Sequence, residues 1–84
     1  MAVNVVAVDN APELLEKIEG IFRNMAEISL LGSFEEAVAV VEFVKENPVD
    51  MVFTDIVMPD ISGISLARKL QQLPNPPAVV LMSS

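Results

Sequence analysis

The chain has 84 residues, 52% of them apolar and 20% charged, which is typical of one small globular domain rather than of a disordered segment. Five Lys and Arg against twelve Asp and Glu give a formal net charge of -7, so like-charge repulsion argues against direct binding to nucleic acid or to an anionic membrane. The chain contains neither Cys nor His, which excludes disulfides, zinc sites built from thiolates, and catalytic triads that need a histidine base.

The first third of the chain predicts a strand followed by a helix. Residues 3–8 form a short Val-rich run that is typical of a buried strand, and the polar pair Asp9-Asn10 ends it. Asn10 is a suitable cap for the next helix, with Pro12 in its first turn. Apolar positions then recur at the helical period of 3.6; they are Leu14, Leu15, Ile18, Ile21, Phe22 and Met25.

The rest of the chain repeats this alternation. Residues 28–31 predict a strand that ends at Gly32, and Ser33 with Glu36 matches a capping box that begins a second helix. The expected inward side of that helix consists of Ala37, Val38, Val40, Val41 and Val44, and Pro48 ends it. Further strands are expected at residues 49–54 and 78–82, with a helix at about residues 64–72 between them.

Strands that alternate with helices of this length predict an α/β fold, a doubly wound parallel sheet with helices on both faces. Ligands of such sheets bind beyond the carboxyl ends of the strands. Asp9 and Asn10 follow the first expected strand, Asp55 follows the third, and Ser83 and Ser84 follow the fourth. The neighbouring Thr54 is expected only to pack, and Asp60 to be a solvated turn residue.

The two aspartates point to phosphoryl chemistry. Carboxylates that converge from adjacent strand ends form the oxygen-rich pocket that Mg²⁺ prefers. A metal ion that neutralises charge allows an anionic nucleophile to approach an anionic phosphoryl donor, and aspartyl carboxylates are known covalent acceptors. Asp55 is the candidate nucleophile.

Two stretches of the chain carry a family resemblance. Residues 8–12 read VDNAP and residues 50–63 read DMVFTDIVMPDISG, and together they resemble the receiver domain of response regulators in bacterial two-component systems. The resemblance implies a flavodoxin-like sheet with strand order 2-1-3-4. It also implies that Asp55 is the phosphoacceptor, within a motif in which Met58, Pro59 and Gly63 shape the following loop.

The resemblance further implies a Mg²⁺ site and a switch. The metal ligands would be Asp9, Asn10, Asp55 and the main-chain carbonyl of Val57. The switch would be a hydroxyl that hydrogen-bonds the new phosphoryl group, with Ser83 the better match and Ser84 next to it. Residues 65–70 resemble, more weakly, receivers that are joined to LytTR-type DNA-binding domains and so act in transcription regulation.

Two departures from the family pattern affect these expectations. Asn10 stands where the family has a second acidic residue, so Mg²⁺ is expected to bind more weakly. Residues 1–84 are interpreted as a partial receiver domain that lacks the fifth strand, the last two helices and the lysine that pairs with the phosphoryl group.

Three functions remain open at this point. The first is a signalling switch, not itself an enzyme, that a partner histidine kinase phosphorylates on Asp55. The second is a pseudo-receiver that is not phosphorylated and acts as an interaction or dimerisation module. The third, a hydrolase with an aspartyl-phosphate intermediate, is disfavoured because its expected second Asp is Val57.

Two further expectations concern the surroundings of the chain. An exposed edge at the fourth strand predicts a homo-oligomer or a domain-swapped assembly. The N-terminus lacks the features of a secretory signal, and no apolar run approaches the roughly 18 residues that span a bilayer, so we expect a cytoplasmic protein without membrane contact.

Overall fold

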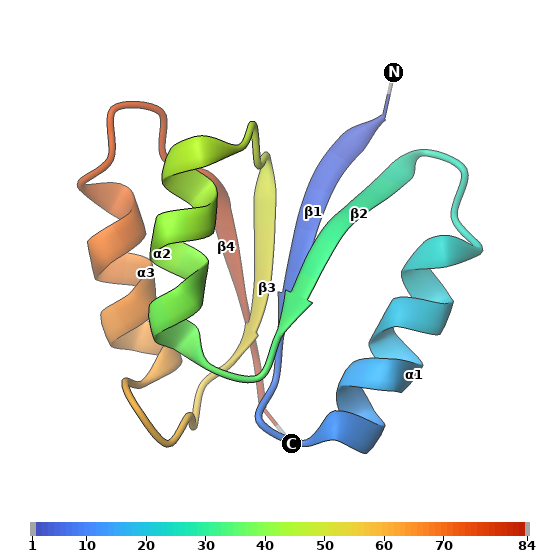
Figure 1. Ribbon diagram of the computed structural model, residues 1–84, viewed down its shortest axis with the longest axis horizontal. Coiled ribbons are helices and arrows are strands. Elements are labelled where there is room, and N and C mark those ends of the chain that lie inside the picture. The colour runs from blue at the N-terminus through green and yellow to red at the C-terminus, as the bar shows by residue number, and fades with distance from the viewer. Residues whose placement is uncertain (1, 84) are drawn as a thin grey trace.

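The computed structural model describes residues 2–83, which alternate strictly between strand and helix (Figure 1). The strands are β1 (Val3–Val8), β2 (Ile28–Phe34), β3 (Met51–Asp55) and β4 (Ala78–Met82), and the helices are α1 (Pro12–Arg23), α2 (Ala37–Glu46) and α3 (Gly63–Gln71). All neighbouring strands are parallel, in the order β2-β1-β3-β4. This confirms the expected flavodoxin-like sheet and its strand order.

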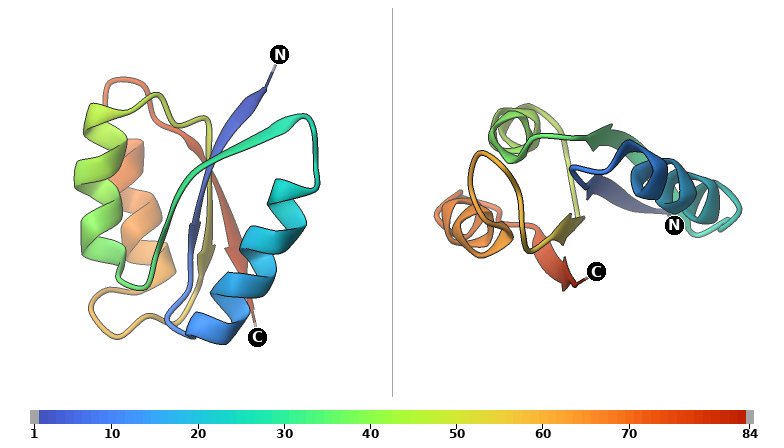
Figure 2. Two further views of the ribbon diagram at one scale, coloured as in Figure 1. Left: turned by 45° about the vertical axis from the view of Figure 1, so that its right-hand side comes forward. Right: turned by 90° about the horizontal axis from the view of Figure 1, so that it is seen from below.

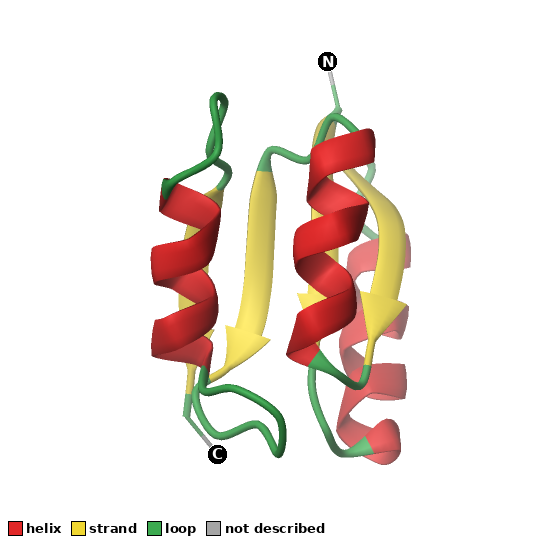
Figure 3. Ribbon diagram, turned by 60° about the vertical axis from the view of Figure 1, so that its left-hand side comes forward, coloured by secondary structure: helices red, strands yellow, loops and turns green. Residues whose placement is uncertain are grey.

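The sheet is covered on both faces, but unequally (Figures 2 and 3). On one face, α2 and α3 pack side by side over a core that includes Val8 and Val52 of the sheet and Leu66 of α3. On the other face, α1 packs over β1 and β2 through Leu15 and Phe22. The expected inward stripe of α1 is therefore only half correct, because the helix does not extend over β4; Leu14, Ile21 and Met25 are exposed.

The predicted boundary between β2 and α2 is wrong. The strand continues through Gly32 to Phe34, with a shift in its register opposite Val5 and Val6. Ser33 is consequently a strand residue whose hydroxyl donates to Glu19, and α2 begins at Ala37 without any side-chain cap from Glu36. Val38, expected to point inward, is 55% exposed at the start of this helix.

The other helix starts also differ in detail from the sequence expectation. The residue before α1 is Ala11 rather than Asn10, and the N–H of Ala11 donates to the carboxylate of Asp9. Ser62 caps α3, with its hydroxyl accepting a hydrogen bond from the N–H of Ser65. Within residues 2–83, no helix is both long enough and apolar enough to cross a membrane.

Candidate functional site

The carboxyl ends of β1, β3 and β4 bring the predicted site residues together. The strand register pairs Val8 with Thr54 and Asp55 with Met82, so Asp9, Asp55 and Ser83 come from three adjacent strand ends. A pocket of about 230 Å³ lies there. Its lining residues are Asp9, Leu14, Lys17, Ile18, Asp55, Met82 and Ser83.

Asp9 is the buried carboxylate of this pocket. Its side chain is only 5% exposed, and its Oδ1 accepts the N–H of Ala11 at 2.8 Å. Burying a carboxylate is costly unless hydrogen bonds or a cation compensate for the lost hydration. The turn into α1 supplies one such hydrogen bond, so Asp9 is held in a fixed position at the end of β1.

Asp55 is the more accessible carboxylate. It is the last residue of β3 and is half-buried, and its Oδ1 accepts the N–H of Val57 at 3.4 Å. A hydrogen bond of that length is weak. The carboxylate of Asp55 thus lies in an open pocket with most of its capacity to bind or attack still available.

The donor set of the pocket fits a hard divalent cation. Among residues 2–83, no cluster of three or more His, Cys, Asp or Glu side chains is present, and the pocket contains two carboxylates, those of Asp9 and Asp55. Mg²⁺ is commonly held by one or two carboxylates together with water and carbonyl oxygens, which suits this arrangement. Asn10 is exposed and does not line the pocket, whereas Val57 lies in the loop that follows Asp55.

The loop between β3 and α3, residues 56–62, is tied down at both ends. Met58 is only 8% exposed and belongs to the core under α2 and α3. The N–H of Gly63 donates to the carbonyl of Ile56 at 2.7 Å, and a Cβ on Gly63 would lie 2.4 Å from the carbonyl oxygen of Asp55. Glycine is required there by close backbone packing, since no described glycine has a positive φ. Pro59 is exposed.

Two residues of this region have contacts that the sequence did not reveal. Asp60 is exposed in the loop, as expected of a solvated turn residue, and its carboxylate also accepts the N–H groups of Ala37 and Val38 at the start of α2. The hydrogen bond from Val38 lowers the pKa of Asp60 below its ordinary value of 3.8, against an opposing effect of desolvation. Lys17 lines the pocket from α1. Its ammonium group forms no ion pair with a described residue, because the single ion pair among residues 2–83 is the one between Lys45 and Glu42. The remaining switch candidate, Ser84, lies outside the described residues.

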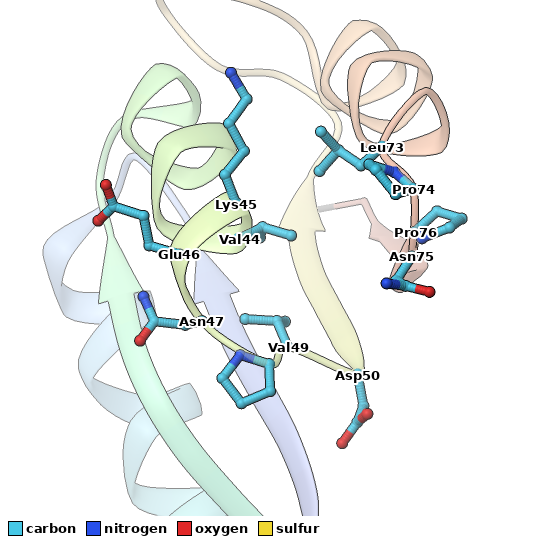
Figure 4. Close-up of a pocket in the computed structure, with 11 residues that line it drawn as sticks. Val44, Lys45, Glu46, Asn47, Val49, Asp50, Leu73, Pro74, Asn75 and Pro76 are labelled. Atoms are coloured by element: carbon cyan, nitrogen blue, oxygen red, sulfur yellow. The ribbon is translucent and has the colours of Figure 1, made fainter.

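A second hollow lies at the opposite end of the sheet, beside the residues that precede β3 (Figure 4). It is formed between the C-terminal end of α2 and the proline-containing turn before β4, and its volume is about 730 Å³. Asp50 at its rim accepts the N–H of Asn4 at 2.8 Å. This hollow is larger than the carboxylate pocket, but it does not bring together groups with an evident chemical task.

The fold and the pocket define a class of protein: a doubly wound α/β domain with an acidic crevice at the carboxyl end of its sheet. The family model of the response regulator receiver domain matches residues 5–84. The chain therefore belongs to the receiver domains of two-component systems, a family of regulatory signalling modules, as the two motifs predicted.

Individual relatives agree with this assignment. The chain is 24% identical over 80 residues to the transcriptional regulatory protein YpdB of Escherichia coli K12, covering 95% of the chain and 33% of YpdB. It is 36% identical over 76 residues to the signal transduction histidine-protein kinase BarA of the same organism, covering 89% of the chain and 8% of BarA. The response regulator domain of CheB from Thermotoga maritima superposes with a TM-score of 0.91 at 23% identity, covering 100% of the chain and 62% of that domain. The chain thus spans a third or less of these two curated relatives.

Proposed function

We propose that the chain is a phosphorylation-dependent switch and that Asp55 is its phosphoacceptor. The observation that carries this proposal is the position of Asp55, half-buried at the end of β3 in a pocket that it shares with Asp9. A carboxylate oxygen of Asp55 attacks the phosphorus of a phosphohistidine on a partner kinase. The P–O bond forms as the P–N bond breaks, and the imidazole leaves with its electron pair and takes up a proton.

Mg²⁺ is the cofactor that the donor set supports. When bound, it neutralises the charge on the phosphoryl oxygens and on the attacking carboxylate. Asp9 and Asp55 would hold it with their carboxylates, and the main-chain carbonyl of Val57 would contribute a neutral oxygen. Asn10, which does not line the pocket in the structure, would have to turn its side chain toward the pocket to contribute another. With Asn10 in place of an acid, the site has one negative charge fewer, and we expect weaker binding.

Ser83 is the proposed switch hydroxyl. It lies directly after β4, next to the pairing of Asp55 with Met82, and it lines the pocket. A hydroxyl at this position can donate a hydrogen bond to a phosphoryl oxygen on Asp55, and Ser84 is the neighbouring candidate. Formation of this bond would move Ser83 toward Asp55 and so change the surface that a partner contacts.

The test is an intact-mass measurement after incubation with Mg²⁺ and a small acyl phosphate donor. We expect one added phosphoryl group in the wild-type chain, none in Asp55→Asn, and an unchanged adduct in Asp50→Asn at the opposite end of the sheet. An adduct that persists in Asp55→Asn would contradict the proposal. Continuous release of phosphate at enzyme rates would favour the hydrolase instead.

A second candidate function is that of a non-phosphorylated interaction or dimerisation module. It is favoured by Asn10 and by β4, an edge strand among the described residues, on which Val80 and Leu81 are 37% and 41% exposed. Such an edge can pair with another copy of the chain or exchange elements with it. Light scattering coupled to size exclusion tests this: a dimer that forms without Mg²⁺ or phosphodonor supports the module, and a monomer at micromolar concentration contradicts it.

The surroundings of the switch are part of the same proposal. The net charge of -7 favours protein partners, first of all a histidine kinase, over direct contact with nucleic acid or membrane. An output in transcription agrees with the name of YpdB, a transcriptional regulatory protein. We propose in addition a cytoplasmic setting and an output through a LytTR-type or another DNA-binding domain.

A further inference from the structure

The carboxylate of Asp60 caps a helix that is far away in the sequence. Its Oδ2 accepts the N–H of Val38 at 2.8 Å, and its Oδ1 accepts the N–H of Ala37 at 3.3 Å. These are the first two residues of α2, which precede Asp60 by 22 and 23 positions. The loop that follows Asp55 is thereby attached to the start of α2.

No local residue performs this task for α2. The first four N–H groups of any helix lack partners within the helix, and a nearby Ser, Thr, Asp or Asn normally satisfies one of them. The residue before α2 is Glu36, whose side chain makes no capping hydrogen bond. A negatively charged carboxylate at this end is also attracted to the positive end of the helix dipole. Asp60 is therefore bound to α2 by both hydrogen bonding and charge.

The attachment matters because of what else the loop carries. Val57, whose carbonyl is a proposed Mg²⁺ ligand, lies between Asp55 and Asp60, and its own side chain is 76% exposed and fixes nothing. The loop is held at Met58 by the core and at Gly63 by the backbone of Ile56. Asp60 adds a third attachment, through its hydrogen bonds to the first two N–H groups of α2.

We propose that Asp60 is a positioning residue for metal binding: by capping α2 it holds residues 56–62 in the conformation in which the Val57 carbonyl serves the Asp9–Asp55 pocket. The inference rests on the proposed function, since it assumes that the pocket takes Mg²⁺. Linkage makes the effect reciprocal, so Mg²⁺ in the pocket strengthens the cap on α2 to the same degree. The start of α2 thus becomes a surface whose order depends on the state of the pocket.

The test measures Mg²⁺ affinity directly, in the full chain, by following backbone amide chemical shifts during a titration with MgCl₂. Partners that orient metal ligands typically contribute about 10–100-fold to affinity, so we expect Asp60→Ala to weaken Mg²⁺ binding about tenfold. Asp60→Asn, which keeps one acceptor oxygen, should lose less Mg²⁺ affinity than Asp60→Ala. The matched control is Asp50→Ala, which removes a carboxylate with a similar hydrogen bond to a backbone N–H but lies at the other end of β3 (Figure 4); its Mg²⁺ affinity should equal that of the wild type.

A second readout tests the reciprocal effect. Hydrogen exchange at the amides of Ala37 and Val38 should slow when Mg²⁺ is added to the wild-type chain, and it should slow less in Asp60→Asn. If Asp60→Ala does not fold, Asp60→Asn and this exchange measurement decide the question.

Three outcomes would overturn the inference. Equal Mg²⁺ affinity in the wild type and in the folded Asp60 variants would show that the cap does not position the loop. An equal loss in Asp50→Ala would show that the effect is general destabilisation. No Mg²⁺ binding in the wild type itself would overturn the proposed function as well, which distinguishes that failure from the first two.

Discussion

The two faces of the sheet are built differently, and the site lies where they meet. The face under α2 and α3 is closed, with Leu66 and Leu70 fully buried. The face under α1 is open toward β4, and Leu14, Ile21 and Val80 there are between 37% and 60% exposed. The loop after Asp55 is fastened to the closed face through Met58 and Asp60, whereas Leu14, Lys17 and Ile18 of α1 form the wall of the pocket.

This difference suggests that the two faces have different functions. Tight packing has few alternative arrangements, so the closed face can hold the carboxylate of Asp55 and its loop in place. The open face leaves the pocket accessible to a partner and leaves apolar surface that a partner can cover. Substitutions that act on one face should therefore differ sharply from matched substitutions on the other.

The largest expected difference is between two leucines. Leu66→Ala on α3 removes a side chain with no exposed surface and should lower the free energy of unfolding by about 3 kcal/mol. Leu14→Ala on α1, where the side chain is already 41% exposed, should cost less than about 1 kcal/mol. Urea denaturation followed by circular dichroism measures both, and equal losses would contradict the contrast between the faces.

Substitution of two glycines by alanine should change the stability of the fold in opposite directions. Gly63→Ala would place a Cβ 2.4 Å from the carbonyl oxygen of Asp55, and moving that backbone should cost about 2 kcal/mol. Gly20→Ala on α1 meets nothing within 4 Å and removes a flexible residue from a helix, so it should stabilise the chain by about 0.5–1 kcal/mol. Thermal unfolding of the two variants decides this, and a stable Gly63→Ala would show that the loop is looser than described.

A third prediction concerns the charge of the pocket. Asn10→Asp restores a second acidic residue after β1, next to Asp9, and additional charged ligands raise the affinity of a site for a divalent cation. We expect Mg²⁺ affinity to rise about tenfold, while stability without Mg²⁺ falls slightly because like charges repel. Calorimetric titration measures this, with Asn24→Asp at the far end of α1 as the control. An unchanged affinity would mean that position 10 does not contribute to the site.

The smallest expected effect is a dependence of stability on pH that originates from Asp60. Because hydrogen bonding from Val38 lowers the pKa of Asp60 in the folded chain, the carboxylate stabilises the fold fully above its ordinary value of 3.8. This contribution is lost as the pH falls through the lowered pKa of the folded state. Asp60→Asn should therefore be less stable than the wild type near neutral pH, and the two should converge in acid. Unfolding curves from about pH 7 down to about pH 2 test this, and a constant difference would contradict it.

The sequence allowed the fold to be predicted because each strand is a short apolar run and most boundaries carry local signals. The start of α2 was an exception. Ser33 and Glu36 match a capping box, yet Ser33 lies in β2, and the cap that α2 uses is Asp60. A pattern over four residues could not reveal a partner more than twenty positions away.

The same distinction applies to the candidate site. Asp9 and Asp55 could be predicted because both directly follow strands, and parallel strands end at the same edge of a sheet. Lys17 could not, because it lies on the polar side of α1 in the sequence pattern, and only the packing of that helix brings it to the pocket. The contact of Asp60 with α2 was missed for the related reason that its partners are backbone N–H groups, which have no sequence signature.

The most direct test of the central claim is to locate the phosphoryl group after transfer from a histidine kinase. An acyl phosphate on aspartate is reduced by borohydride to homoserine, which tandem mass spectrometry can assign to one position of the chain. We predict homoserine at position 55, formed only when Mg²⁺ and the phosphorylated kinase are both present. Homoserine at another aspartate, or none at all while a known receiver domain is labelled in parallel, would contradict the account.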